Sequence, residues 1–596
     1  MQPRIEDYAY ISDNNTGALV GKDGSIDWLC LPRFDSGACF AALLGEDKNG
    51  SWRIGPTESD ARVKRSYRKG TLILETEFTT NSGTVKLIDF MPHRHKFPTV
   101  VRIVEGVSGT VDMELLLRVR FDYGWVVPWA RTLSDGALSF VAGPDAMELR
   151  TPIELHGADH RTEAQFRVSA GDRVPFVMVW HNSADPNPTA HDADELLDRS
   201  MKSWLEWSNT CSSTGRYKEE ISDSLVVLKG LIYEPTGGVV AAATTSLPED
   251  IGGERNWDYR YCWLRDASMT MHAFVRAGYV EEARQWRDWL LRAVAGAPDQ
   301  IQIMYGIDGS RRLPELELDW LSGYEDSRPV RIGNGAVDQF QLDVPGEVLD
   351  SMAYAREAGI PPDPRAWSVQ RAILETVADK WQEPDEGIWE VRGGQRQFVH
   401  SKVMAWVAAD RATTAMTQYG LPGDAKRWSA MADQIKKQVC EEGFNTELNS
   451  FVQYYGADAT DASLLLLPLV GFLPATDPMI RGTIARIEHE LEHDGFVERY
   501  ATEAAASDGL AGSEGAFLIC SFWLIQALAG EGRVERAREL LEKMLDLRND
   551  VGLLAEEYDP STKRMLGNFP QAFSHIGLVN AASVCELKKG ETSPLL

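Results

Sequence analysis

The sequence predicts a protein of two parts, a β-sandwich followed by a toroid of helical hairpins. The chain has 596 residues, which is too many for one ordinary hydrophobic core. Short runs of alternating apolar and polar residues fill the first third, and helical spacing of apolar residues replaces them near residue 192. We therefore expect a sandwich domain over residues 1–192, a helical linker over 193–216 and a helical domain over 217–596.

The predicted sandwich rests on strand-like runs separated by Gly, Asn, Asp and Pro. Thr71–Thr76 and Thr84–Asp89 alternate in the manner of strands with one buried face. Val111–Phe121 and Phe176–Trp180 continue the pattern. Many short strands at regular spacing are typical of a sandwich.

The helical part begins with Asp194–Trp207, whose apolar residues recur at helical spacing and predict the linker helix. Further on, helices are expected to stop at turns that contain glycine, because Gly fits the position after a helix and Pro cannot continue one. These turns are Ala277-Gly278-Tyr279, Ala358-Gly359-Ile360-Pro361, Tyr419-Gly420-Leu421-Pro422 and Ala529-Gly530-Glu531-Gly532. The apolar run Ala462–Leu473 is too short to span a bilayer and predicts a buried helix.

Composition narrows the class of partner. The formal net charge of −28 argues against nucleic acid and against anionic membranes, and it is compatible with a small neutral oligosaccharide. The segment Met1–Asp7 has no apolar stretch typical of a signal peptide, so we expect a cytoplasmic protein. The seven cysteines are scattered without metal-ligand spacing. We therefore expect reduced thiols and neither a metal nor a cofactor, in a monomer or a homo-oligomer.

An aromatic and charged segment, Asn256–Ser268, is the first candidate for a site. In an extended strand, alternate side chains share one face. Those that would do so are Trp257, Tyr259, Tyr261, Trp263 and Arg265. One interpretation is a wall for a sugar ring that ends in Arg265-Asp266. The other is a core strand followed by Asp266 as the N-cap of a helix beginning near Ala267, and spacing alone does not separate the two.

Two acidic segments, Gly387–Gly393 and Gly552–Pro560, each place a Glu on a predicted loop. The neighbouring Trp389 is expected to raise the pKa of Glu390, as a general acid requires. Glu556 has polar neighbours and is expected to stay ionised as a base. Two carboxylates in different environments are the machinery of glycoside hydrolysis. The alternative is a surface charge, because the chain has 89 acidic residues.

Several motifs occur together in the order of a known family. They are Ile5–Gly37, Trp263–Asp266, Gly387–Gly393 and Ala555–Tyr558. Over nearly its whole length, the chain resembles glycoside hydrolase family 15, which includes glucoamylases, isomaltose glucohydrolases and bacterial trehalases. The resemblance implies an N-terminal β-sandwich (a supersandwich), a helical linker and an (α/α)₆ barrel.

The resemblance also implies roles. Glu390 resembles the general acid and Glu556 the general base of an inverting enzyme, with carboxyl groups about 6.5–9.5 Å apart. The residues implied to hold the sugar are Trp263, Arg265, Asp266, Trp389, Arg499 and Phe573. Two positions depart from the fungal glucoamylases: Phe573 replaces a Trp, and Val391 replaces a Glu directly after the acid. These departures count against a specificity for long starch chains.

Further candidates have a structural alternative of similar weight. His400 and Lys402 are expected either to orient the acid or bind the leaving group, or to form a helix-start hydrogen bond and a surface charge. Glu557, next to the base, is another candidate. Arg33-Phe34-Asp35 is expected to reach over the barrel mouth, with a structural turn as the alternative. The segment Arg331–Gly335 is expected to add polar contacts to the pocket.

The expected function is hydrolysis of a short α-glucoside from its non-reducing end, with inversion and release of β-glucose. α,α-Trehalose is the first expected substrate, because no starch-binding module or export signal is visible. The alternatives are a glucoamylase-type or isomaltose glucohydrolase activity on α-1,4- or α-1,6-linked gluco-oligosaccharides. A non-catalytic carbohydrate-binding protein and a phosphorylase are less consistent with the sequence, since both Glu390 and Glu556 are retained.

Overall fold

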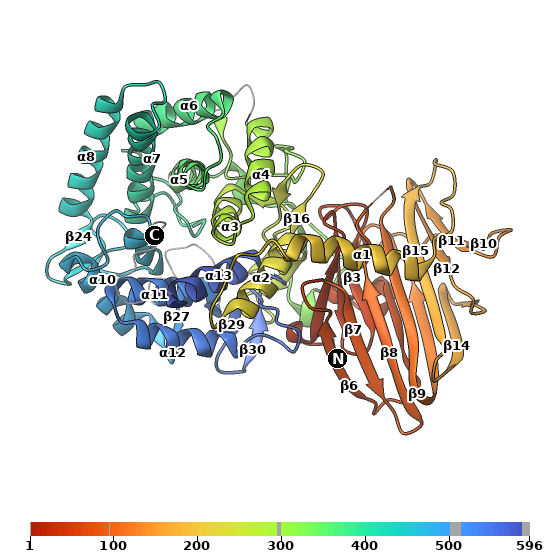
Figure 1. The fold of residues 1–596 in the computed structure, drawn as a ribbon. Coiled ribbons are helices and arrows are strands. Elements are labelled where there is room, and N and C mark those ends of the chain that lie inside the picture. Colours follow the sequence, from red (N-terminus) through yellow and green to blue (C-terminus); the bar gives the residue numbers. More distant parts are fainter. Residues whose placement is uncertain (1, 95, 295–299, 501–513, 587–596) are drawn as a thin grey trace.

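The computed structural model describes residues 2–94, 96–294, 300–500 and 514–586. An antiparallel β-rich part and a ring of helices lie side by side (Figure 1). Helix α1 (Ala193–Ser208) runs across the strands toward the ring. This is the predicted combination of a β-sandwich with an (α/α)₆ barrel.

The β-rich part is built on one long strand that belongs to both layers. The strands are β1 Tyr8–Ser12, β2 Gly17–Gly21, β3 Ser25–Cys30, β4 Ala38–Phe40, β5 Ser51–Pro56, β6 Arg62–Tyr67, β7 Leu74–Thr79, β8 Gly83–Phe90, β9 Thr99–Arg118, β10 Trp129–Thr132, β11 Leu138–Ala142, β12 Asp145–Arg150, β13 His156–Ala158, β14 Arg161–Ser169 and β15 Arg173–Asn182. The first half of β9 pairs with β8 and β15, and its second half pairs with β5 and β14. The predicted strand at residues 71–76 begins later, at Leu74, because residues 68–71 form a turn.

Between the layers lies an apolar core that includes the fully buried Trp52 and Phe176. One buried ion pair crosses it. Arg102 contacts Asp89 at 2.7 Å and donates to the carbonyls of Trp52 and Gly24 at 2.6 Å. Each nitrogen of the Arg102 guanidinium and both carboxylate oxygens of Asp89 therefore have a hydrogen-bond partner, which is the condition under which a buried charge is tolerated.

Helix α1 closes the outer face of the sandwich next to the ring. The Asp192 side chain caps it by accepting from the backbone N–H groups of Asp194 and Glu195. Its buried residues Leu196 and Leu197 pack on a small apolar cluster of β8, β9 and β15. The helix predicted over residues 194–207 is confirmed.

The helices form two concentric layers. They are α2 Lys218–Gly230, α3 Leu264–Arg276, α4 Val280–Ala293, α5 Asp343–Glu357, α6 Pro364–Lys380, α7 Val399–Gln418, α8 Ala425–Glu442, α9 Leu466–Leu469, α10 Pro478–Glu490, α11 Leu518–Glu531, α12 Val534–Leu545 and α13 Ala572–Glu586. Helices α3, α5, α7, α9, α11 and α13 contact one another in succession, and α13 contacts α3, so the inner layer closes on itself. The even-numbered helices pack outside it. The predicted buried helix at residues 462–473 is a short 3₁₀ turn, Ala462–Leu465, followed by α9.

The predicted glycine stops end four inner helices. Helices α3, α5 and α7 each end two residues before their glycine, which has positive φ in every case (Gly278, Gly359 and Gly420). Helix α11 continues through Gly530 and ends at Glu531, and the next residue, Gly532, is left-handed. The prediction is therefore confirmed for each helix, with a shift of one glycine in α11.

The segment Asn256–Ser268 is not one strand. Asn256–Asp258 (β19) pairs with Thr245–Pro248 (β18), whereas Cys262–Trp263 (β20) pairs with Met304–Tyr305 (β21). Because the two halves have different partners, the chain bends between them, and α3 begins at Leu264 with Trp263 as its N-cap. The predicted single strand and the predicted N-cap at Asp266 are therefore wrong. Four residues of the expected face, Trp257, Tyr259, Trp263 and Arg265, nevertheless line one cavity, and Tyr261 does not.

Contacts from the sandwich fix the part of the ring that carries this segment. The indole N–H of Trp28 donates to the Ala243 carbonyl at 2.9 Å. Arg260 is fully buried, pairs with Asp258 at 2.7 Å and donates to the Tyr123 hydroxyl at 2.8 Å. In the part of the chain that the structure describes, no helix has both the length and the apolar character of a membrane span.

Candidate active site

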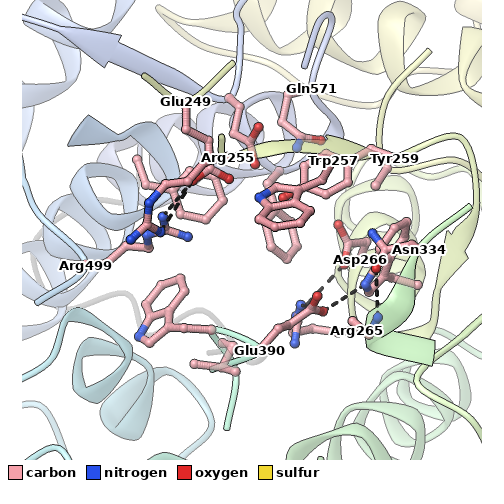
Figure 2. Close-up of a pocket in the computed structure, with 18 of the residues that line it drawn as sticks. Glu249, Arg255, Trp257, Tyr259, Arg265, Asp266, Asn334, Glu390, Arg499 and Gln571 are labelled. Carbon is pink, nitrogen blue, oxygen red and sulfur yellow. Dashed lines mark hydrogen bonds and ion pairs between the residues drawn. The ribbon is translucent and has the colours of Figure 1, made fainter. Parts of the chain in front are cut away.

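One cavity gathers most of the predicted residues. It encloses about 820 Å³, counting its open mouth, and loops that join the helices line it. Its lining residues are Ala241, Glu249, Arg255, Trp257, Tyr259, Trp263, Arg265, Asp266, Asn334, Ala336, Ile388, Trp389, Glu390, Val391, Arg392, Arg499, Tyr500, Phe517, Glu556, Gln571 and Phe573. Figure 2 shows Glu390 beside Arg265 and Asp266, with Arg255 and Arg499 on the other side. Its size and mixed lining are typical of a small-molecule site.

The loop between α6 and α7 presents Glu390 to this cavity. The backbone of Glu390 has φ 57°, a left-handed conformation that costs a non-glycine residue about 1–3 kcal/mol. The Gln339 side chain holds it by donating to the Glu390 carbonyl at 3.1 Å. Gly387 makes the turn possible, since a Cβ there would lie 2.8 Å from the Phe398 ring. The chain therefore uses strain and a tight turn to aim this carboxylate.

Two donors of the same motif contact the Glu390 carboxylate. The Trp263 indole N–H donates to Oε1 at 2.9 Å, and Arg265 Nη2 lies 3.4 Å from the same atom. The Glu390 side chain remains 21% exposed. Trp263 and Arg265 flank the N-terminus of α3, so the start of this helix sets the position of the carboxylate.

Arg265 and Asp266 form a buried polar floor. Arg265 Nη1 lies 3.2 Å from Gln341 Oε1 and 3.5 Å from Asp343 Oδ2. Burial raises the pKa of Asp266 to about 7 against the opposing charge of Arg265. Within the described residues, Arg265 Nε and Asp266 Oδ2 have no hydrogen-bond partner. Buried polar atoms of this kind are suited to the hydroxyls of a sugar.

Glu556 lies directly before β29 (Glu557–Asp559) and is 2% exposed. Its Oε2 accepts from the Asn568 backbone N–H at 3.1 Å, and the Tyr259 hydroxyl also donates to the carboxylate. Gly567, with φ 73°, packs against it, and a Cβ at that residue would lie 2.4 Å from Oε2. The position of Glu556 therefore depends on the absence of a side chain at residue 567.

The environments of the two carboxylates are the reverse of those predicted. Glu390, expected beside an apolar ring, is partly exposed and contacts a cation and an N–H group. Glu556, expected in a polar setting, is buried, and burial together with the charge of Glu249 raises its pKa well above the usual value. Trp389 turns away from Glu390, because its indole N–H donates to both oxygens of Asp461 at 3.0 and 2.9 Å.

A cluster of charged side chains lies beside Glu556. Glu249, Glu514 and Glu557 place their carboxylates within 4.8 Å of one another. Arg499 contacts Glu249 at 3.1 Å, Glu557 at 3.7 Å and Glu514 more closely, and Arg255 contacts Glu514 at 3.3 Å. Two guanidinium groups lie among the three carboxylates, so the cluster is a network of ion pairs. This network holds Arg499 at the cavity wall.

Eight predicted residues line the cavity together: Trp263, Arg265, Asp266, Trp389, Glu390, Arg499, Glu556 and Phe573. Phe573 lies on α13, and the guanidinium carbon of Arg265 stands 5.9 Å from the centroid of its ring. Glu557 does not line the cavity. Adjacent residues of a strand point to opposite faces, and Glu557 accepts from the Gly515 N–H on the side away from the cavity.

The other candidates also lie outside the cavity lining. Lys402 is fully buried and donates to the carbonyls of Trp381 and Glu383 at 2.6 Å, where it caps the end of α6. Burial lowers the pKa of Lys402 to about 8. His400 is buried behind Arg265, and burial followed by that charge lowers its pKa to about 3, so it is neutral. The alternative of a surface lysine is wrong, because Lys402 is buried, and among the described residues neither ring nitrogen of His400 has a hydrogen-bond partner.

Arg33 and Phe34 do not reach over the cavity. Arg33 pairs with Asp35 at 2.6 Å and with Asp308 of the helical part at 2.8 Å. Phe34 is 1% exposed and its carbonyl accepts from Arg260. The segment is an anchor between the two parts, which is the structural alternative.

Sequence reasoning missed several lining residues. Glu249 and Arg255 flank the turn between β18 and β19, and Gln571 begins the segment that leads into α13. A buried pair of opposite charges six residues apart carries no distinctive signal in the sequence. Arg392 stands two residues after Glu390, where a charged side chain on a loop does not by itself indicate a site residue.

Comparisons with known proteins agree with this geometry. A sequence model of glycosyl hydrolases family 15 matches residues 215–583. A model of trehalase-like N-terminal domains matches residues 1–204. Together the two models account for nearly the whole chain.

Curated relatives and solved structures point the same way. The chain is 37% identical to a trehalase of Thermoplasma volcanium over 98% of this chain and 94% of the relative. It is 39% identical to a trehalase of Mycolicibacterium smegmatis over 97% of this chain and 91% of the relative. A bacterial glucoamylase complexed with acarbose is 13% identical, with a TM-score of 0.72 over 98% of this chain and 95% of that one. The last comparison shows a shared fold.

Proposed function

Because the chain belongs to glycosyl hydrolases family 15, whose members hydrolyse O-glycosyl bonds, we propose that it is an inverting α-glucosidase whose substrate is α,α-trehalose. The observation that carries the chemistry is that Glu390 and Glu556 line one cavity with the buried pair Arg265 and Asp266. The substrate is supported by the trehalases to which the chain is similar over nearly its full length.

In the proposed reaction, Arg265 and Asp266 hold the non-reducing glucose through its hydroxyls. Glu390 donates its proton to the glycosidic oxygen as the bond from that oxygen to the anomeric carbon breaks. Glu556 removes a proton from the water that attacks the anomeric carbon from the opposite face. We expect the two carboxyl groups to stand about 6.5–9.5 Å apart, which leaves room for that water. Proton exchange with solvent then restores both carboxyl groups.

The surroundings of the two groups set a condition on these roles. Burial and Glu249 raise the pKa of Glu556 to about 8, whereas the Asn568 N–H and Arg499 lower it, so the pH at which this carboxyl ionises depends on the ion-pair network. The Trp263 indole and Arg265 hold the Glu390 carboxyl at the mouth of the sugar pocket. Glu556 is thus a strong base that acts only in its ionised form, and the acidic limb of the kcat/KM profile should report that ionisation.

The test is product analysis with trehalose in deuterated buffer. Inversion at one anomeric carbon yields one β-glucose and one α-glucose, so proton NMR should first show the anomers in equal amounts. Initial formation of α-glucose alone would show retention and refute the mechanism. Glu390→Gln and Glu556→Gln should each lose most of the turnover while keeping the fold, and near-normal turnover in either would remove that residue from its role.

A substrate panel separates the proposed substrate from the alternatives. We expect kcat/KM for trehalose to exceed that for maltose, isomaltose and soluble starch. A preference for isomaltose or maltose would place the chain with the isomaltose glucohydrolases or glucoamylases. No hydrolysis of any α-glucoside, with sugar binding retained, would indicate a carbohydrate-binding protein.

A further inference from the structure

The outer end of the cavity carries a stack of side chains that the proposed reaction does not use. Two arginines stack on the Trp257 ring. The guanidinium carbon of Arg331 lies 4.6 Å from the ring centroid, and that of Arg392 lies 4.4 Å from it. Glu315 links the two arginines, at 3.7 Å from Arg331 and 3.6 Å from Arg392. Figure 2 shows Trp257 among the side chains of the cavity, next to Tyr259.

The members of this stack differ in how firmly they are held. Arg331 is 11% exposed and donates to the backbone carbonyls of Glu254 and Asn256 at 2.7 and 3.2 Å. Arg392 is 37% exposed, and its ion pair with Glu315 is long. Arg331 is therefore a fixed support, and Arg392 is the outer and more adjustable member.

The position of Arg392 is tied to that of the acid. It follows Glu390 by two residues, and Gln339 holds the intervening backbone by donating to the Glu390 carbonyl at 3.1 Å and the Val391 carbonyl at 3.5 Å. A general acid must lie beside the glycosidic oxygen that it protonates. Arg392 lines the same cavity as Glu390, so its side chain lies within the space that the substrate would occupy.

We propose that Arg392 closes the leaving-group end of the cavity and limits the substrate to two sugar units. Its guanidinium donates to hydroxyls of the leaving sugar, and its stacking on Trp257 keeps that ring from serving as a platform for a third sugar. Guanidinium groups combine planar stacking with several directed donors, which lysine lacks. This inference rests on the proposed glycosidase function of the same site and adds the residue that sets substrate length.

The experiment compares matched disaccharides and trisaccharides, namely maltose with maltotriose and isomaltose with isomaltotriose, and includes trehalose. The wild type should favour each disaccharide. Arg392→Ala should lower kcat/KM for disaccharides by about tenfold or more, mainly through KM, and should raise the ratio of trisaccharide to disaccharide. Arg392→Lys keeps the charge but loses the planar stack, and should show the same change of ratio.

The matched control is Arg396→Ala. Arg396 lies on the same loop, stacks on Tyr454 at 4.8 Å and does not line the cavity, so its loss should leave the ratio unchanged. An unchanged ratio in Arg392→Ala, or equal wild-type activity on both lengths, would overturn the inference. A wild type that cleaves maltose but not trehalose would refute the proposed substrate while the length ratio still decides the role of Arg392. No turnover of any sugar would overturn both.

Discussion

Gly567 offers a direct test of how far the base depends on its position. In Gly567→Ala, the new Cβ would lie 2.4 Å from Oε2 of Glu556 and 2.6 Å from its Cβ, whereas ordinary contacts begin near 3.4 Å. Glu556 must therefore move by about 1 Å, and a misplacement of that size costs about 100-fold in rate. The positive φ of 73° adds a backbone cost of about 1 kcal/mol for alanine.

Gly552→Ala separates these two effects. Gly552 also has positive φ, at 87°, but its added Cβ would meet no described atom within 4 Å. Both variants should lose about 1 kcal/mol of stability in urea unfolding, whereas only Gly567→Ala should lose about 100-fold in kcat/KM for glucose release. If kcat/KM of Gly567→Ala stayed within about threefold of that of Gly552→Ala, the reasoning that the glycine positions Glu556 would be refuted.

Three more predictions follow from buried charges. Glu249→Gln removes a charge that raises the pKa of Glu556, so the base stays ionised to lower pH, and the acidic limb of the kcat/KM profile should move to lower pH. Asp461→Ala removes both acceptors of the Trp389 indole and should cost about tenfold in kcat/KM, measured with the separate changes in kcat and KM. Asp89→Ala leaves its arginine partner charged and buried, and should lower the free energy of unfolding by about 3–5 kcal/mol in urea titration.

Each of these has a control of matched chemistry. Glu375 is half exposed and pairs with Arg427 on the surface, so Glu375→Gln should leave the pH profile in place and Glu375→Ala should cost about 0–1 kcal/mol. Asp461→Asn retains one acceptor and should lose less activity than Asp461→Ala. A pH profile of Glu249→Gln that moves upward or stays in place would contradict the assigned electrostatic effect.

The sequence predicted what local patterns determine. The linker helix, the glycine stops and the four named strand runs follow from periodicity within a few residues, and each of them overlaps an element of the structure. The bend in Asn256–Ser268 was missed because it depends on two strand partners elsewhere in the chain. No pattern within thirteen residues distinguishes one continuous strand from two that pair separately.

The environment of Glu556 was missed for the same reason. Gly567 packs against its side chain and Tyr259 hydrogen-bonds to it. Neither contact can be read from the residues that adjoin Glu556 in the sequence. Lys402 shows the reverse case: a lysine near a helix start reads as a surface charge, yet its ammonium binds carbonyls at the end of another helix. Motifs indicated which residues to consider, and tertiary packing determined which of them share a cavity.

Closure of the inner ring has a consequence for biosynthesis. Helix α13 contacts α2, α3 and α11, so the last helix of the chain joins the first helices of the ring to one of the last. The sandwich strands end at Asn182 and can pair while the rest of the chain is still being translated, whereas the ring stays open until Ala572–Glu586 has emerged. A nascent or prematurely terminated chain would expose the inner faces of these helices, and Phe573 would be missing from the cavity wall. Synthesis of the last helix is thus also the step that completes the catalytic cavity.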